Sequence, residues 1–181
     1  VFPLFDTKGE VIAFSGRALA KQTEPKYLNS PDTSVFTKHE VLYGLDKAKD
    51  KIRRKDYAVL VEGQMDLVLS HQVGVDNTVA SSGTAFTREH LERLKRFSSR
   101  IILAFDGDLA GKKASEKSSE LGLALGLEVK IAKLPEGRDP ADLAKEDPES
   151  WKKVLREAKS SVEAMIDYVL ALEKDTSKAA R

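Results

Sequence analysis

The sequence predicts an α/β fold in which a parallel β-sheet is flanked by helices. The first observation is that residues 57–61 and 101–105 are continuous apolar runs, too short for helices and without the alternation of a half-exposed strand. The second is that segments of helical length separate the predicted strands, in the alternating order that gives a parallel sheet. The third is that each of these two runs ends directly before an acidic residue and a glycine.

The first predicted region, residues 1–56, is an N-terminal α+β portion of the chain with a basic surface. Residues 1–19 are expected to form two strands joined by a turn that contains Gly9. Residues 25–36 are expected to form an extended loop, and residues 43–54 a short helix. This region carries 11 basic and 8 acidic side chains, whereas the whole chain has a net charge of +1. Such a basic surface suits a nucleic acid, although an ordinary solvated surface would carry the same charges.

The second predicted region, residues 57–145, is the α/β domain itself. Its strands and helices are expected to alternate along the chain, so that the strands are parallel and buried on both faces. The strands are expected over residues 57–61, 77–81, 101–105 and 128–134, and the helices over residues 65–71, 87–97 and 110–125.

The third predicted region, residues 146–181, is the start of a C-terminal helical segment. Asp147 precedes Pro148, as a helix N-cap precedes a proline at the first helical position, and Ser160 with Glu163 has the spacing of a capping box. An apolar stripe at helical spacing then indicates packing against a neighbour rather than ligand binding. The stripe consists of Val162, Met165, Ile166, Val169 and Leu170.

The composition limits the class of protein. A chain of 181 residues with 41% hydrophobic content can form one core of ordinary size, and no apolar run approaches the length of a membrane span. The absence of cysteine excludes a disulfide framework and a thiolate zinc site within this segment. Because the sequence begins at Val1 without an initiator methionine or a signal-peptide pattern, we expect a fragment of a soluble protein.

Three acidic residues follow the two buried strands at the points where those strands end. Glu62 follows the first strand, and Asp106 and Asp108 follow the second. Ligands of parallel sheets bind beyond the carboxyl ends of the strands, so we expect the three carboxylates to share one pocket. Two carboxylates about 4 Å apart repel by roughly 4 kcal/mol at an effective dielectric constant of about 20, so such a cluster favours a bound cation. A ligand set of oxygens alone favours Mg²⁺ or Mn²⁺ over zinc.

Each acid also has a structural interpretation. An aspartate shortly after a strand is often a helix N-cap, which applies to Asp108. Asp66 lies in the first turn of a predicted helix, where an acid interacts favourably with the helix dipole whatever its function. The structural interpretation is weakest for Glu62, because an acid at the end of a buried central strand is costly without a partner.

Seven ordered segments carry a specific family resemblance: FSGRAL, PKYLNSPDT, FTKHEVLYGL, VEGQMDLVLSHQVGV, VASSGTAFT, AFDGDLAGKKA and LPEGRDPADL. In this order they resemble the signature stretches of the catalytic core of the bacterial replicative primase of the DnaG type. The resemblance covers nearly the whole chain up to Leu143. The VEG and DGD segments alone would indicate only the broader Toprim domain, whereas KYLNSP and YGL select primase. The resemblance therefore implies a Toprim-type sheet for residues 57–145.

The resemblance implies a nucleotidyltransferase, a DNA-directed RNA polymerase that builds short RNA primers on single-stranded DNA from ribonucleoside triphosphates. Its catalytic residues correspond to Glu62, Asp106 and Asp108, and its cofactor is Mg²⁺ or Mn²⁺. Asp142 is a doubtful addition, because the family's last motif often reads Asp-Pro-Asp where this chain has Asp139-Pro140-Ala141-Asp142. The implied metal positions are Glu62, Asp66, Asp106, Asp108 and Asp139.

The resemblance also implies that the basic region holds template or nucleotide. Arginine can fork phosphate oxygens, lysine supplies a mobile charge, and tyrosine can stack on a base. Each matching lysine could equally be a solvated surface residue. The matching residues are Arg17, Lys26, Tyr27, Asn29 and Lys38.

Members of this family carry a zinc-binding module upstream and a helicase-interacting domain downstream. The implied partners therefore include the replicative helicase, through a domain outside this chain, and no membrane. The implied location is the bacterial cytoplasm, at the nucleoid-associated replisome. The isolated fragment is expected to synthesise primers weakly or not at all.

Two other classes of protein stay open. A non-catalytic Toprim-like module would bind nucleic acid without the reaction. A haloacid-dehalogenase-type phosphatase also has Asp-x-Asp after a strand, but there the motif normally opens the domain, whereas Asp106 follows two earlier predicted strands.

Overall fold

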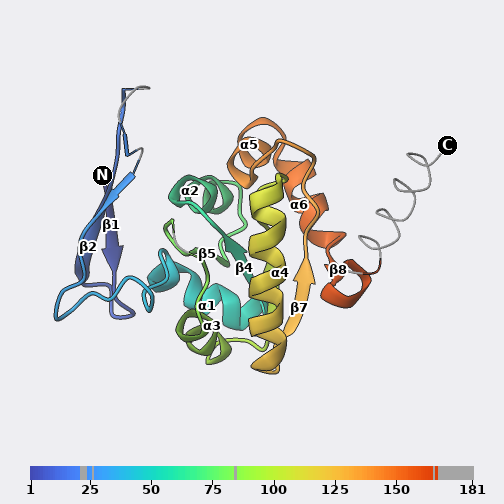
Figure 1. Cartoon of the computed structure of the whole chain (residues 1–181), viewed down its shortest axis with the longest axis horizontal. Helices are drawn as coiled ribbons and strands as arrows, with labels where there is room; N and C mark the ends of the chain where they lie inside the picture. Colours follow the sequence, from blue (N-terminus) through green and yellow to red (C-terminus); the bar gives the residue numbers. More distant parts are fainter. Residues whose placement is uncertain (21–23, 26, 84, 165, 167–181) are drawn as a thin grey trace, which may run out of the picture.

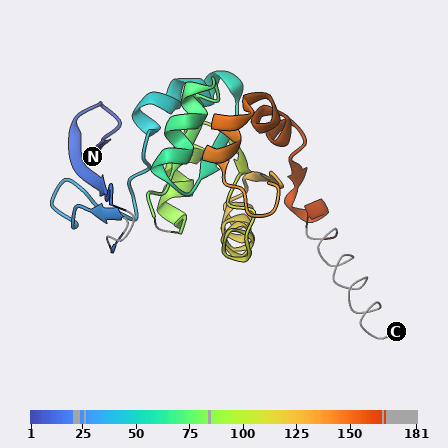
Figure 2. The same ribbon diagram turned by 90° about the horizontal axis from the view of Figure 1, so that it is seen from above.

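The computed structural model describes residues 1–20, 24–25, 27–83, 85–164 and 166. They form a three-stranded antiparallel sheet and, beside it, a layered α/β body (Figure 1). Figure 2, seen from above, also places the small sheet to one side of that body. The prediction of a parallel sheet flanked by helices, with an N-terminal α+β portion and a helical end, is confirmed.

The small sheet has the strand order β1-β2-β3. The first two strands, β1 (Phe2–Phe5) and β2 (Val11–Arg17), were expected, with their connection at the predicted turn. The third, β3 (Tyr27–Asn29), lies within the segment predicted as an extended loop. Its three residues pair with β2, with Leu28 opposite Gly16, which is too short a run to stand out in a sequence.

The second sheet has the strand order β5-β4-β6-β7-β8. Its first four strands are parallel, and β8 pairs with β7 in the antiparallel direction. The two-residue β8 had no sequence signal of its own. The strands are β4 (Ala58–Val61), β5 (Thr78–Ala80), β6 (Arg100–Leu103), β7 (Glu128–Ile131) and β8 (Lys159–Ser160).

Helices cover both faces of this sheet, as the apolar strands require. Leu60 and Leu103 pack into one core cluster together with residues of α1, α3 and α4, and Val59 and Ile102 pack into a second with residues of α2, α5 and α6. The short α5 was not expected from the sequence. The helices are α1 (Leu45–Lys55), α2 (Gln64–Gln72), α3 (Arg88–Lys95), α4 (Leu109–Ala124), α5 (Pro140–Glu146) and α6 (Pro148–Arg156).

The predicted helix caps near the C-terminal end are confirmed. Asp147 accepts a hydrogen bond from the backbone N–H of Ser150 at 3.0 Å, at the start of α6. The backbone N–H of Ser160 donates to Glu163 at 3.0 Å, and that of Glu163 donates to the Ser160 hydroxyl at 3.3 Å. Of the predicted apolar stripe, Val162 and Ile166 are exposed, and Met165, Val169 and Leu170 lie outside the described residues.

Buried contacts hold the small sheet against the α/β body. The Gln64 side chain at the start of α2 donates a hydrogen bond to the Ser15 hydroxyl of β2 at 2.9 Å, and both residues are buried. Tyr43 and Ala80 exchange two backbone hydrogen bonds, at 2.9 and 3.1 Å. The small sheet is therefore fixed beside the carboxyl ends of the parallel strands. Within the described part of the chain, no helix is both long and apolar enough to cross a membrane.

Candidate active site

Two acids of the site follow neighbouring parallel strands. The strands β4 and β6 pair directly, with Leu60 opposite Leu103, and the backbone N–H of Ala104 donates to the Leu60 carbonyl at 2.9 Å. Glu62 follows β4, and Asp106 lies three residues after the end of β6. Because the two strands run in the same direction and in register, both acids are at the carboxyl edge of the sheet, where parallel sheets bind ligands.

Glu62 is the electrostatic centre of this group. Burial raises the pKa of its carboxyl group, and the negative charges of Asp106 and Asp108 raise it further, whereas a hydrogen bond from the backbone N–H of Asp106 lowers it. Its Oε1 atom is buried and has no hydrogen-bond partner among the described residues. The three predicted acids therefore lie close enough to feel each other's charge, and one buried oxygen is left to accept a proton or bind a cation.

Asp108 is exposed and caps the N-terminus of α4. Its Oδ1 accepts a hydrogen bond from the backbone N–H of Gly111 at 2.8 Å. The helix-cap interpretation is thus confirmed for this residue. A carboxylate has about four lone-pair positions on its two oxygens. The cap therefore fixes the Asp108 side chain at the site and leaves lone pairs that can bind a cation.

Two glycines allow the backbone to pass close to Asp106. A Cβ atom on Gly111 would lie 2.2 Å from the Asp106 carbonyl oxygen, and one on Gly107 would lie 2.2 Å from the Pro135 carbonyl oxygen. Any side chain at either position would force the backbone apart. The need for Gly111 was not predicted, although a glycine in the first turn of a helix was a visible signal.

Asp66 is buried and joins two segments. Its Oδ2 accepts from the backbone N–H of Gly63 at 2.9 Å, and its Oδ1 accepts from that of Ala141 at 3.2 Å. Burial is the main reason that its pKa rises to about 7; the charges of Asp139 and Asp106 also raise it, and the two hydrogen bonds lower it. Both oxygens therefore already have donors, and the assignment of Asp66 as a metal ligand stays a prediction.

Asp139 and Asp142 lie at the start of α5 and differ in their surroundings. Asp139 is the N-cap of this helix and accepts from the backbone N–H of Asp142 at 2.6 Å. The Asp142 carboxylate is half exposed and faces Arg138, with 3.9 Å between Oδ2 and Nε. Asp139 acts on the pKa of Asp66, so it lies near the other acids, and its role as a metal ligand stays a prediction.

The carboxylate oxygens of this site could supply part of the coordination shell of a divalent cation. In the described ranges, no group of three or more histidine, aspartate or glutamate side chains could by itself hold a metal ion. The unpartnered Oε1 of Glu62 and the neighbouring aspartates are nevertheless hard oxygen donors. Mg²⁺ in nucleotide-handling sites is commonly held by one or two carboxylates, with waters and phosphates completing its shell. This site fits that pattern rather than a closed protein cage.

Aromatic and cationic residues of the small sheet lie beside the acids. The Arg17 guanidinium carbon is 5.6 Å from the centre of the Tyr27 ring. Burial raises the pKa of Tyr27, Arg17 lowers it, and the charges of Asp66 and Asp139 raise it. Tyr27 is therefore within electrostatic reach of the acidic edge.

The other predicted basic-region residues differ in how the structure places them. Asn29 donates from Nδ2 to the Ser82 carbonyl at 3.2 Å, so it is fixed at the loop that follows β5. The backbone N–H of Lys38 donates to Asp32 at 2.9 Å. A hydrogen bond between the Lys38 backbone and the His90 side chain of α3 raises the pKa of His90. Lys26 lies outside the described residues. Arg17, Tyr27 and Asn29 are thus the members that the structure brings to the site.

The anchors of this arrangement were missed in the sequence. Ser82 has a φ of 59°, in the left-handed region that non-glycine residues seldom adopt, and its carbonyl receives Asn29. Gln64 is buried and binds Ser15. The Ser-Ser-Gly run after a predicted strand was a signal for the unusual backbone at Ser82. Nothing in a single sequence signals the hydrogen bond between Gln64 and Ser15.

Comparisons with known proteins agree with this arrangement. A family model described as Toprim-like matches residues 59–144, and a model for the N-terminal domain of the DNA primase catalytic core matches residues 1–49. A DNA primase of Staphylococcus epidermidis is 42% identical over 162 residues, which cover 89% of this chain. The match spans only 27% of that relative's length.

Solved structures extend the likeness to the fold. The zinc-binding and RNA polymerase domains of the Aquifex aeolicus primase superpose with a TM-score of 0.87 at 38% identity, covering 97% of this chain and 44% of that one. A DnaG primase catalytic domain bound to single-stranded DNA superposes with a TM-score of 0.79 at 37% identity, covering 88% of this chain and 51% of that one. These likenesses do not favour the phosphatase or the non-catalytic module. The chain belongs to the family of bacterial DnaG-type DNA primases, as a part of their catalytic core.

Proposed function

We propose that this chain carries the reaction centre of a primase, which joins ribonucleotides into short RNA primers on a single-stranded DNA template. One observation supports this most strongly. Glu62, with a buried and unpartnered oxygen, lies within electrostatic reach of Asp106 and Asp108 at the ends of adjacent parallel strands. A carboxylate cluster of this kind suits phosphoryl transfer, in which positioning and charge stabilisation supply most of the catalysis.

The proposed roles of the acids follow from their surroundings. In the proposed step the 3′-hydroxyl oxygen of the primer forms a bond to the α-phosphorus of a ribonucleoside triphosphate, and the bond from that phosphorus to pyrophosphate breaks. Glu62 has a raised pKa and a free Oε1, so it would accept the proton of that hydroxyl group. Asp106 and Asp108 would hold Mg²⁺ or Mn²⁺, with Glu62 as a further donor. When bound, the ion would lower the pKa of the hydroxyl group and neutralise charge on the phosphates. Asp66 and Asp139 hold the surrounding backbone through their hydrogen bonds and would be further ligands of the ion, and Asp142 is the doubtful member of the set.

The proposed binding surface is the small sheet. Arg17 would bind phosphate oxygens of the template or nucleotide, and Tyr27 would stack on a base. Asn29, held by Ser82, would offer its Oδ1, which is buried and has no partner among the described residues. Lys26 and Lys38 would add positive charge for binding the template or nucleotide.

The wider assignment rests on the family. We propose a basic subdomain portion over residues 1–56, a Toprim domain over residues 57–145 and the start of a helical subdomain over residues 146–181. The substrates would be ribonucleoside triphosphates, and the protein would act at the replisome in the bacterial cytoplasm together with the replicative helicase.

A templated incorporation assay tests the proposal. The intact protein, given single-stranded DNA, ribonucleoside triphosphates and Mg²⁺, is expected to form short RNA products, and Asp106→Asn is expected to reduce the rate at least a hundredfold. Asp142→Asn serves as the matched control and should keep most of the activity. Equal rates for the Asp106 variant and the unmodified protein would refute the proposed reaction centre.

A further inference from the structure

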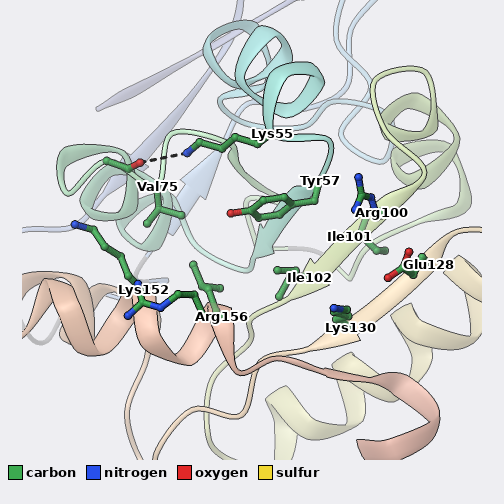
Figure 3. A pocket seen from close by; sticks show the side chains of 12 residues that line it. Lys55, Tyr57, Val75, Arg100, Ile101, Ile102, Glu128, Lys130, Lys152 and Arg156 are labelled. Carbon is green, nitrogen blue, oxygen red and sulfur yellow. Dashed lines mark hydrogen bonds between the residues drawn. The ribbon is translucent and has the colours of Figure 1, made fainter.

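A cavity lies at the opposite edge of the large sheet from the acids. It has a volume of about 430 Å³ and is formed at the amino ends of β4, β6 and β7, between the end of α1 and one face of α6 (Figure 3). The acids lie at the carboxyl ends of the parallel strands, where such sheets bind substrates, so this cavity is separate from the candidate active site. Its size lies within the range of small-molecule sites.

The charge around this cavity is strongly positive. Among the described residues that line it, five are basic and one, Glu128, is acidic. Three of the basic side chains already have an anionic partner. Lys55 pairs with Asp76, Arg100 with Asp56, and Lys152 with Glu149.

The other two cations are not neutralised in this way. No carboxylate of the described residues lies within ion-pair distance of Lys130 or Arg156. Lys130 projects from β7, and Arg156 lies one helical turn after Lys152 on α6, so these cations approach the cavity from two elements. Arg156 acts on the Glu149 carboxylate only through its charge, without an ion pair between them. Two cations on different walls of one cavity, neither held in an ion pair, suit a phosphate group.

The rest of the cavity wall is aromatic and aliphatic. Figure 3 shows the ring of Tyr57 between Lys55 on one side and the residues of α6 on the other. Val75, Ile102 and Leu155 complete this part of the lining. A planar, partly apolar group could stack on the Tyr57 ring while a charged group reaches Lys130 and Arg156.

We propose that this cavity binds a nucleoside phosphate, with its base against Tyr57 and its phosphates between Lys130 and Arg156. The site requires no metal ion, because its cations come from the protein. A ligand there would contact the starts of β4 and β6, whose opposite ends precede Glu62 and Asp106. The proposal does not depend on the reaction proposed for those acids.

Calorimetric titration of the intact protein with ATP tests this site. EDTA is added to remove divalent cations, so that ATP cannot bind through a metal ion at the acids. We expect saturable binding that Lys130→Gln with Arg156→Gln weakens about tenfold or more. Arg96→Gln with Lys117→Gln removes the same charge from exposed residues outside the cavity and should leave the affinity unchanged. Asp106→Asn should also leave it unchanged, which separates this site from the proposed reaction centre.

Inorganic triphosphate distinguishes a nucleotide site from a plain anion site. We expect Tyr57→Leu to weaken ATP binding several-fold but to leave triphosphate binding unchanged, because only the base contacts the ring. If Tyr57→Leu weakened the binding of both ligands equally, or weakened the binding of neither, the base contact would be overturned. No ATP binding in EDTA, or the same affinity after removal of Lys130 and Arg156 charges, would overturn the site altogether.

Discussion

The carboxylate of Asp66 accepts a hydrogen bond from the backbone N–H of Ala141 at 3.2 Å, and this contact joins the start of α2 to the start of α5. The same carboxylate also accepts from Gly63, directly after Glu62. One buried side chain therefore ties the segment that carries the Glu62 carboxylate to the segment capped by Asp139. The acidic edge is held together by backbone contacts as well as by proximity of strands.

Asp66→Ala is expected to loosen the start of α5. The backbone N–H groups of Gly63 and Ala141 lose their acceptor, so they should open and exchange more readily. Hydrogen exchange followed by mass spectrometry should show at least a tenfold faster exchange of the amides near Ala141. Asp142→Ala, on the exposed side of the same helix, is the control. Unchanged protection in the Asp66 variant would show that this contact is not formed in solution.

Gly111→Ala is expected to disturb the site rather than strengthen the helix. Alanine in place of glycine ordinarily favours a helix by about 0.5–1 kcal/mol. Here the new Cβ would lie 2.2 Å from the Asp106 carbonyl oxygen, so the first turn of α4 and Asp106 must separate. We expect lower stability and about tenfold weaker Mn²⁺ binding, measured by titration with electron paramagnetic resonance.

The matched control for this change is Gly122→Ala, near the other end of α4. Its Cβ would lie 2.8 Å from a methyl group of Val129, so it should lower stability and leave the affinity for Mn²⁺ unchanged. Equal loss of Mn²⁺ binding in both variants would mean that the effect of Gly111 is one of general stability.

His90 is expected to make folding sensitive to mild acid. It is fully buried, and burial is the main cause that lowers its pKa from 6.5 to about 4. Between these two values the unfolded chain binds a proton more readily than the folded chain, so stability falls as the pH falls from 6.5 toward about 4. The loss from this group would reach roughly 3 kcal/mol.

Urea unfolding at a series of pH values checks this, with His90→Gln as the variant that cannot titrate. Its free energy of unfolding should depend less on pH than that of the unmodified protein across the same range. Parallel pH profiles for the two proteins would show that His90 does not carry this dependence.

Arg17→Gln is expected to weaken the binding of single-stranded DNA. An arginine that contacts one phosphate releases about one counterion, so its loss should reduce the slope of log affinity against log salt by about 0.7. Fluorescence anisotropy over a salt series measures this slope. Arg96→Gln, an exposed arginine just after α3, removes the same charge elsewhere. The same slope in the Arg17 and Arg96 variants would remove Arg17 from the binding surface.

The sequence was sufficient for the features that depend on local pattern. The buried runs at 57–61 and 101–105 predicted two strands of the parallel sheet, with the acids after them at its carboxyl edge. The structure shows that these two strands are neighbours. The caps at Asp147 and Ser160 were also readable, because their side chains act within three residues.

The features that the sequence did not reveal depend on contacts between distant segments. The Asp66 to Ala141 bond spans 75 positions, and the Gln64 to Ser15 bond spans 49. Such pairings follow from tertiary packing and leave no periodicity. The short β3 is likewise defined by its partner strand rather than by its own three residues.

The central claim is that the strand-end acids Glu62, Asp106 and Asp108 bind a divalent cation. Anomalous X-ray diffraction from crystals of the intact protein grown with Mn²⁺ tests it most directly. We predict a manganese peak within about 2–2.5 Å of an Asp106 or Asp108 carboxylate oxygen, with Glu62 in the same or the adjoining coordination shell. A fully loaded crystal with its manganese elsewhere, or with Glu62 more than about 10 Å from the ion, would contradict the account.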